Sequence, residues 1–269
     1  MNANTVRFIE EDDGVIVEIN GVPQSYVDVE DPTKLIFPYM ERMADFLDQI
    51  VPSGQRYRVV HVGGAGMSLA RYVSVTRPTS PQIVLEPDEA LTAAVREKLP
   101  LPLRSGIKVR PLDGRAGIAG MRDDFAQVII VDAFSSASVP KELVSVEFFA
   151  EIKRVLTPDG LLLMNVIDQR PFDWTRRVVA GLAWLFKEVV VGAEPRIFNQ
   201  PRFGNLLLGA SQADIPLDDI KKEATKAIWP YRYIGSEKIG RFIAGAEAFT
   251  DADAEPSPVA SKHGILRFS

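Results

Sequence analysis

The sequence predicts an α/β fold in which strands and helices alternate around one mostly parallel sheet. Three observations support this prediction. Short apolar runs alternate with amphipathic segments from about residue 58 to 208, a glycine-rich turn at residues 63–66 follows the first run, and an acid, Glu86, closes the second. Proteins of this class hold nucleotide-type ligands in this way, because glycine lets the backbone approach the ligand and a helix N-terminus offers free N–H groups.

A small N-terminal β-hairpin appendage, residues 1–34, is expected ahead of the main domain. Residues 6–29 alternate in polarity, and Asn20-Gly21 suits the positive φ angles of a tight hairpin turn. Residues 35–50 carry apolar side chains at helical spacing, and Pro52-Ser53-Gly54 ends that pattern. A leading helix therefore opens the main domain, for which we expect residues 35–245.

Seven strands are expected in this domain. They are predicted at residues 58–62, 82–85, 107–110, 127–131, 161–167, 189–191 and 205–208, with helices at 68–73, 88–99, 141–156 and 172–186. Between the last two strands the chain is broken by glycine and proline and shows no helical pattern, so these strands are expected to pair antiparallel. A parallel sheet closed by one antiparallel edge strand is typical of the methyltransferase-like Rossmann fold that binds S-adenosylmethionine. Leu69 agrees, since it stands where a dinucleotide fingerprint has its third glycine.

Composition excludes several classes of site. The 269 residues include no cysteine, which rules out disulfides, thiolate metal sites and cysteine nucleophiles. The two histidines, His61 and His263, lie far apart in sequence, which argues against a zinc site or a Ser-His-Asp triad, and we expect no metal. A net charge of −5 argues against a nucleic-acid partner.

The N-terminus lacks a secretory pattern, and the C-terminal stretch is polar. Residues 1–13 lack the layout of a signal peptide, and no apolar run approaches the roughly 20 residues needed to span a bilayer, so we expect no membrane partner and a cytoplasmic location. Residues 246–269 begin with an acidic, proline-broken stretch and are expected to form a flexible tail.

Polar residues at five strand ends are expected to converge on one crevice, because ligands of open α/β sheets bind at the carboxyl ends of the strands. Glu86 either binds ribose hydroxyls or caps the helix that follows Pro87-Asp88. Asp113-Gly114 either lies beside an adenine or forms a plain turn.

Two further strand ends and one histidine complete the candidates. Asp132 follows the apolar run 128–131 at the rim of a buried sheet. It either has a functional role in the crevice or caps the next turn. Asp168 is a weaker candidate, and His61 is expected to pack within its strand rather than act as a base.

Several motifs resemble the spermidine synthase, or polyamine aminopropyltransferase, family. They are LEPD at 85–88, PLDGR at 111–115, VIIVDAFSS at 128–136, LTPDG at 156–160 and the hairpin segment EINGVPQS at 18–25. The resemblance covers roughly residues 15–210. It implies a transferase that uses decarboxylated S-adenosylmethionine or S-adenosylmethionine as co-substrate without a metal, a small-molecule amine acceptor, and a homodimer.

The resemblance also implies roles for individual residues. The co-substrate would be bound by Gln24, Gly63, Gly64, Gly66, Glu86, Asp113 and Gly114. Asp132 would help to deprotonate the attacking amine, which has no lone pair while it is protonated.

The sequence departs from the family pattern at three places. Ala65 occupies the turn position at which the family has an acid, Ser135 replaces the second acid of its Asp-x-x-Asp pair, and no histidine accompanies Tyr39. Two alternatives therefore stay open: a methyltransferase on the same scaffold, and a catalytically silent member that binds a nucleoside or a protein partner.

Overall fold

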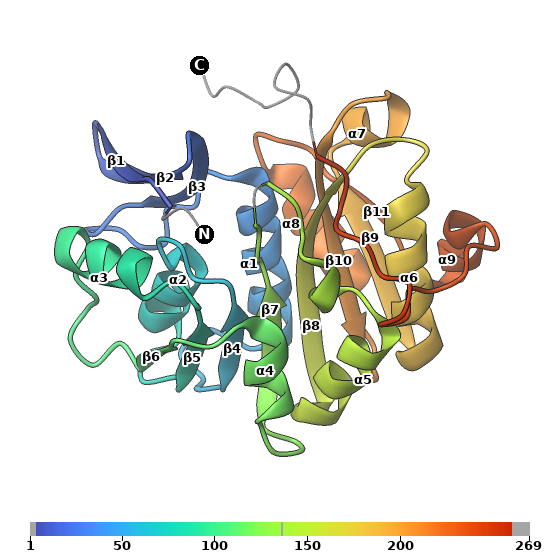
Figure 1. Ribbon diagram of the computed structural model, residues 1–269, viewed down its shortest axis with the longest axis horizontal. Coiled ribbons are helices and arrows are strands. Elements are labelled where there is room, and N and C mark those ends of the chain that lie inside the picture. The colour runs from blue at the N-terminus through green and yellow to red at the C-terminus, as the bar shows by residue number, and fades with distance from the viewer. Residues whose placement is uncertain (1–3, 136, 260–269) are drawn as a thin grey trace.

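A computed structural model describes residues 4–135 and 137–259. Within these residues the chain forms one large mixed sheet flanked by helices and a separate, smaller antiparallel sheet (Figure 1). The large sheet has the spatial order β11 (Arg232–Ile234), β9 (Glu188–Ala193), β10 (Gly204–Ser211), β8 (Leu156–Asp168), β7 (Ala126–Val131), β4 (Val59–Val62), β5 (Gln82–Leu85) and β6 (Ile107–Arg110). The small sheet contains β1 (Val6–Glu11), β2 (Gly14–Ile19) and β3 (Val22–Val27).

Helices fill the connections between the strands. They are α1 (Pro38–Ile50), α2 (Ser68–Thr76), α3 (Glu89–Lys98), α4 (Gly114–Ala119), a 3-10 turn η1 (Lys141–Leu143), α5 (Val146–Val155), α6 (Asp173–Leu185), α7 (Pro195–Asn199), α8 (Leu217–Lys226) and α9 (Ser236–Ile243). No helix in the described part of the chain is long and apolar enough to cross a membrane.

The predicted antiparallel pairing of the last two strands is confirmed, but their place in the sheet differs from the prediction. β10 pairs antiparallel with both β8 and β9, so it lies inside the sheet rather than at its edge. Its side chains are buried along almost the whole strand, which requires cover from neighbours on both sides. The count of seven strands also needs correction, because the three-residue strand β11 adds an eighth at the edge of β9 and is too short to show a periodic pattern.

The central strands are buried on both faces, as their apolar runs predict. Along β7, Ile129 and Val131 contribute to the core beneath α5 and α6, whereas Val128 and Ile130 contribute to the core beneath α1 and α8. From Val128 to Val131 the strand is therefore apolar and buried, and Asp132 is the first polar residue on its carboxyl side.

The N-terminal region turns where the sequence predicts. Asn20 and Gly21 connect β2 to β3 with φ angles of 53° and 82°. The predicted hairpin is, however, part of a three-stranded meander, because β1 also pairs with β2. β3 approaches the start of α2, where Ser25 Oγ accepts a hydrogen bond from Gly66 N–H at 3.0 Å and brings the small sheet over the glycine turn.

The expectation of a flexible tail is wrong for residues 246–259, and residues 260–269 lie outside the described part of the chain. Phe249 is fully buried, with the Arg177 guanidinium 3.9 Å from its ring centroid. The Asp251 carboxylate accepts two hydrogen bonds from Arg115, at 2.7 and 2.5 Å. One aromatic anchor and paired carboxylates thus hold a segment whose composition is typical of disorder.

Candidate functional site

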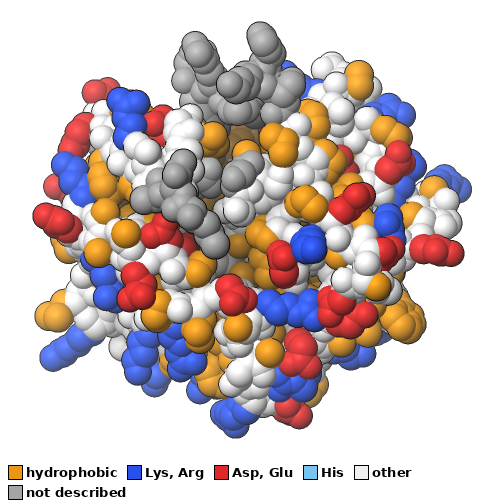
Figure 2. All heavy atoms as spheres, viewed as in Figure 1, with side chains coloured by type: hydrophobic (Ala, Val, Ile, Leu, Met, Phe, Trp, Pro, Cys, Tyr) orange, Lys and Arg blue, Asp and Glu red, His pale blue; other side chains and the backbone are white. Residues whose placement is uncertain are grey.

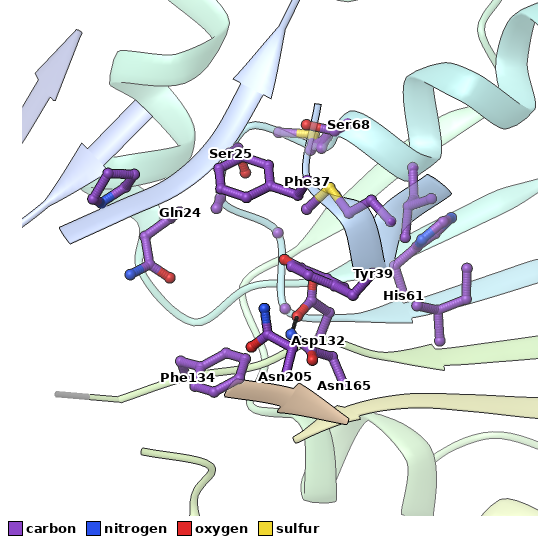
Figure 3. Close-up of a pocket in the computed structure, with 18 of the residues that line it drawn as sticks. Gln24, Ser25, Phe37, Tyr39, His61, Ser68, Asp132, Phe134, Asn165 and Asn205 are labelled. Atoms are coloured by element: carbon purple, nitrogen blue, oxygen red, sulfur yellow. Dashed lines mark hydrogen bonds between the residues drawn. The ribbon is translucent and has the colours of Figure 1, made fainter. Parts of the chain in front are cut away.

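A pocket opens at the carboxyl ends of β4, β7 and β8, below the small sheet (Figure 3). Its walls come from β3, the start of α1, the glycine turn after β4, the loop after β7, the end of β8 and the start of β10. Of the predicted site residues, four line it directly: Gln24, Gly63, Gly64 and Asp132. Charged side chains of both signs are interspersed over the face of the molecule seen in Figure 2.

The glycine turn is shaped by close contact with neighbouring backbone. Gly63 has a φ angle of 96°, and a Cβ atom there would lie 2.2 Å from the carbonyl oxygen of Asp132. The Gly63 N–H donates to Leu85 O at 3.0 Å, and the Asp132 N–H donates to Val62 O at 2.9 Å, which ties the turn to both neighbouring strand ends. Only glycine fits at residue 63. The close contact between Gly63 and the Asp132 backbone holds Asp132 next to the glycine turn.

Glu86 supports the glycine turn by accepting a hydrogen bond from the backbone of the turn. Its carboxylate accepts hydrogen bonds from Gly64 N–H and from Asp88 N–H, both at 3.0 Å. Burial raises the pKa of Glu86, and these backbone hydrogen bonds partly oppose the rise. Asp88, not Glu86, caps the following helix by accepting from Leu91 N–H at 2.9 Å. Glu86 therefore stands against the lining residue Gly64, and the binding of ribose hydroxyls stays a prediction.

Three predicted residues are not part of the pocket lining. Asp113 caps α4 by accepting from Ala116 N–H at 2.9 Å, a role that the sequence did not predict. Gly114 packs against Val62, and Gly66 donates its N–H to Ser25. Contact of these three residues with a co-substrate stays a prediction.

Asp132 is the centre of the polar part of the pocket. Asn165 Nδ2 donates to its Oδ1 at 3.0 Å, and the Tyr39 hydroxyl donates to its Oδ2 at 3.1 Å (Figure 3). Burial raises the pKa of Asp132, and the two hydrogen bonds partly oppose the rise. The pKa of Tyr39 lies well above its ordinary value because of burial and the nearby Asp132 carboxylate. A carboxylate held by two neutral donors keeps its orientation and remains able to accept a proton.

The sequence did not single out several of the polar and aromatic lining residues. Asn165 and Asn205 place side-chain amides at the pocket, and Phe134 and Phe203 place rings there. Asn165 had a readable signal, because a buried amide inside the apolar run 161–167 needs a polar partner. Asn205 and Phe203 reach the pocket because β10 pairs with β8, and Phe134 reaches it through the loop after β7.

The remaining two candidates have structural partners. His61 is buried, its Nε2 lies 2.9 Å from Gln82 Oε1, and burial lowers its pKa to about 4. The prediction that His61 packs within its strand is confirmed. Asp168 accepts hydrogen bonds from the N–H and the hydroxyl of Thr175, at 3.0 and 2.7 Å, and thereby secures the start of α6.

The described residues contain no group of three or more His, Asp or Glu side chains placed to hold a metal ion. Within the same part of the chain, the polar side chains that line the pocket are one carboxylate, one imidazole, three amides and three hydroxyls, which suit an organic ligand.

Comparison with known proteins gives one consistent relationship. No family model matches the chain. A polyamine aminopropyltransferase from Chromobacterium violaceum is 25% identical over 143 residues, which are 53% of this chain and 53% of that protein. The chain thus matches about half the length of this curated relative.

Solved structures match over a larger part of the chain. The crystal structure of a probable spermidine synthase from Corynebacterium glutamicum is 28% identical, with a TM-score of 0.86 over 93% of this chain and 94% of that one. Human methyltransferase-like protein 13, solved in complex with SAH, shares the fold at 19% identity, with a TM-score of 0.57 over 80% of this chain and 96% of that one. With the motifs and the pocket described above, these similarities support a relationship to the spermidine synthase family on a methyltransferase-like Rossmann fold.

Proposed function

We propose that this chain is a transferase that moves the aminopropyl group of decarboxylated S-adenosylmethionine to an amine held against Asp132. The position of Asp132 carries the proposal: it is a carboxylate at the end of β7, in the pocket, with both oxygens oriented by neutral donors. The similarity to polyamine aminopropyltransferases supports the type of reaction, and the SAH held by the human neighbour supports an adenosyl ligand.

Asp132 would supply the base that this reaction needs. An amine attacks carbon only after it loses a proton, and the carboxylate accepts that proton. The amine nitrogen then bonds to the aminopropyl carbon next to sulfur, the carbon–sulfur bond breaks, and its electron pair converts the sulfonium to a neutral thioether, methylthioadenosine. Asn165 and Tyr39 hold the carboxylate in one orientation during this step, which favours the alignment that displacement requires.

The adenosyl part is assigned to the other half of the pocket. The turn at Gly63 and Gly64 leaves no room for side chains, since a Cβ atom at Gly64 would lie 3.0 Å from the Glu86 side chain, so this wall of the pocket is formed by backbone. Gln24 from β3 faces the same space (Figure 3). We assign Glu86 and Asp113-Gly114 to the ribose and adenine as the family resemblance implies, with Gly66 as part of the turn.

One observation favours a second candidate, methyl transfer from S-adenosylmethionine. Ala65 lines the pocket with a methyl group where the family has an acid, so the turn offers no carboxylate for an aminopropyl ammonium. Such a turn also offers no repulsion to the carboxylate of S-adenosylmethionine.

Titration calorimetry and product analysis separate the candidates. We expect calorimetry to show binding of decarboxylated S-adenosylmethionine and of methylthioadenosine, and mass spectrometry to show an aminopropylated amine with release of methylthioadenosine. Binding of S-adenosylmethionine alone, with a methylated product, would favour the second candidate. Binding of methylthioadenosine with no product across a panel of amines would favour a silent member of the family.

A further inference from the structure

We infer that the acceptor is a monoamine, a molecule with one ammonium group on an otherwise neutral body, and not a diamine. This inference rests on the proposed aminopropyl transfer and names the substrate class for the same pocket. The observation that carries it is the distribution of charge over the pocket walls.

Asp132 is the only Asp, Glu, Lys or Arg among the described residues that line the pocket. His61 is neutral there, because burial lowers its pKa to about 4. The other polar side chains in the lining are neutral: the amides of Gln24, Asn165 and Asn205, and the hydroxyls of Ser25, Tyr39 and Ser68. The lining thus provides one negative charge and several neutral hydrogen-bonding groups.

One ammonium group fits this arrangement well. An ammonium has three N–H donors, and Asp132 can accept from it in addition to the bonds from Asn165 and Tyr39. The half-buried amide of Asn205 lines the same pocket, and its side-chain oxygen can act as a second acceptor. The pocket can therefore satisfy the reacting end of an amine.

The decarboxylated donor already brings an ammonium and a sulfonium to a lining whose one acidic residue, among those described, is Asp132. A second ammonium group on the acceptor therefore finds no matching partner. It would have to leave water for a space lined by amides and by the rings of Phe37, Phe134 and Phe203, and a buried charge without a counter-charge is costly. Aromatic rings attract cations less strongly than a carboxylate does. A hydroxyl or an apolar group meets no such penalty, since amides bind the first and rings the second.

Two acceptors that differ at one end test this inference. 1,4-Diaminobutane and 4-amino-1-butanol have nearly the same length and the same reacting amine, and they differ in a distal ammonium against a distal hydroxyl. With decarboxylated S-adenosylmethionine as donor, we expect kcat/KM to be at least about tenfold higher for the amino alcohol. Equal values, or a preference for the diamine, would overturn the monoamine inference and leave the proposed function standing. Transfer to neither amine would contradict the proposed function itself, and the inference with it.

A charge introduced into the pocket provides a second test. Asn205→Asp adds a carboxylate at a half-buried lining position, and it should shift the kcat/KM ratio toward the diamine by about tenfold or more. Asn199→Asp makes the same chemical change at an exposed position at the end of α7, outside the lining, and should leave the ratio unchanged. Equal ratios in wild type, Asn205→Asp and Asn199→Asp would contradict the inference.

Discussion

Acidification should destabilise the protein through His61. Its ring is 5% exposed in the centre of the sheet, and its Nε2 is 2.9 Å from Gln82 Oε1. Burial lowers its pKa from the ordinary value of 6.5 to about 4, so the folded chain keeps the ring neutral at pH values where the unfolded chain binds a proton. His61 therefore contributes stability above pH 6.5 that is lost as the pH falls toward 4.

The size of the effect follows from these two pKa values. The difference between 6.5 and about 4 is about 2.5 pH units, and at about 1.4 kcal/mol per unit the complete loss is about 3 kcal/mol. At pH 5 the folded chain is still mostly neutral and the unfolded chain mostly protonated, which gives a loss of about 2 kcal/mol relative to pH 7.5.

Urea unfolding of the wild type and of His61→Gln at pH 7.5 and 5 measures this loss. Other groups whose pKa is shifted, such as Asp132 and Glu86, are present in both proteins and cancel in the comparison. The change in unfolding free energy between the two pH values should be about 2 kcal/mol smaller in His61→Gln. The same pH dependence in both proteins would refute the burial argument.

Three further predictions concern the site and its support. Asp132→Asn keeps the shape of the side chain but removes the base, so turnover should fall by about 10²–10⁴-fold while calorimetry shows nearly unchanged co-substrate affinity; persistent turnover would mean that another group is the base. Phe249→Ala removes a fully buried ring and should lower the free energy of unfolding by about 3–5 kcal/mol. The control Trp184→Ala changes a side chain that is 74% exposed, and it should change this free energy by no more than about 0.5 kcal/mol. Similar urea midpoints for both variants would show that residues 246–259 are not part of the fold. Gly63→Ala combines a positive φ with a Cβ 2.2 Å from Asp132 O, whereas Gly54→Ala has a positive φ and no atom of the described residues within 4 Å of its Cβ. Thermal melts and turnover assays should therefore show a larger loss of stability and activity for Gly63→Ala. Equal losses in both variants would mean that the positive φ alone accounts for the cost.

Local patterns were enough to predict most of the sheet and the position of the site. The apolar runs around His61 and Ile130 mark strands that are buried on both faces. A polar residue directly after such a run is expected at the carboxyl end of its strand, where the buried part of the sheet stops. Asp132 and the turn at Gly63 were therefore predictable from sequence, as was the antiparallel pairing of β9 with β10.

Tertiary contacts decided what the sequence could not. Asn165 and Tyr39 are 126 residues apart, and only the packed fold brings both to the Asp132 carboxylate. Asp113-Gly114 has the same local sequence whether it forms a plain turn or lies beside an adenine, so the dipeptide left both open, and the cap that Asp113 provides to α4 was not predicted. The segment around Phe249 looks disordered by composition, because its stability comes from a single ring and from arginines of α4 and α6.

The assembly of the chain stays a prediction, since the homodimer is implied by the family resemblance. Light scattering of the purified protein measures it directly.

Mass spectrometry of the reaction with decarboxylated S-adenosylmethionine tests the central claim most directly. With 4-amino-1-butanol as acceptor, wild-type protein should add one aminopropyl unit to the amine and release an equal amount of methylthioadenosine, and Asp132→Asn should form neither product at a comparable rate. A methylated amine formed from S-adenosylmethionine, with no aminopropyl product from the decarboxylated form, would contradict the claim.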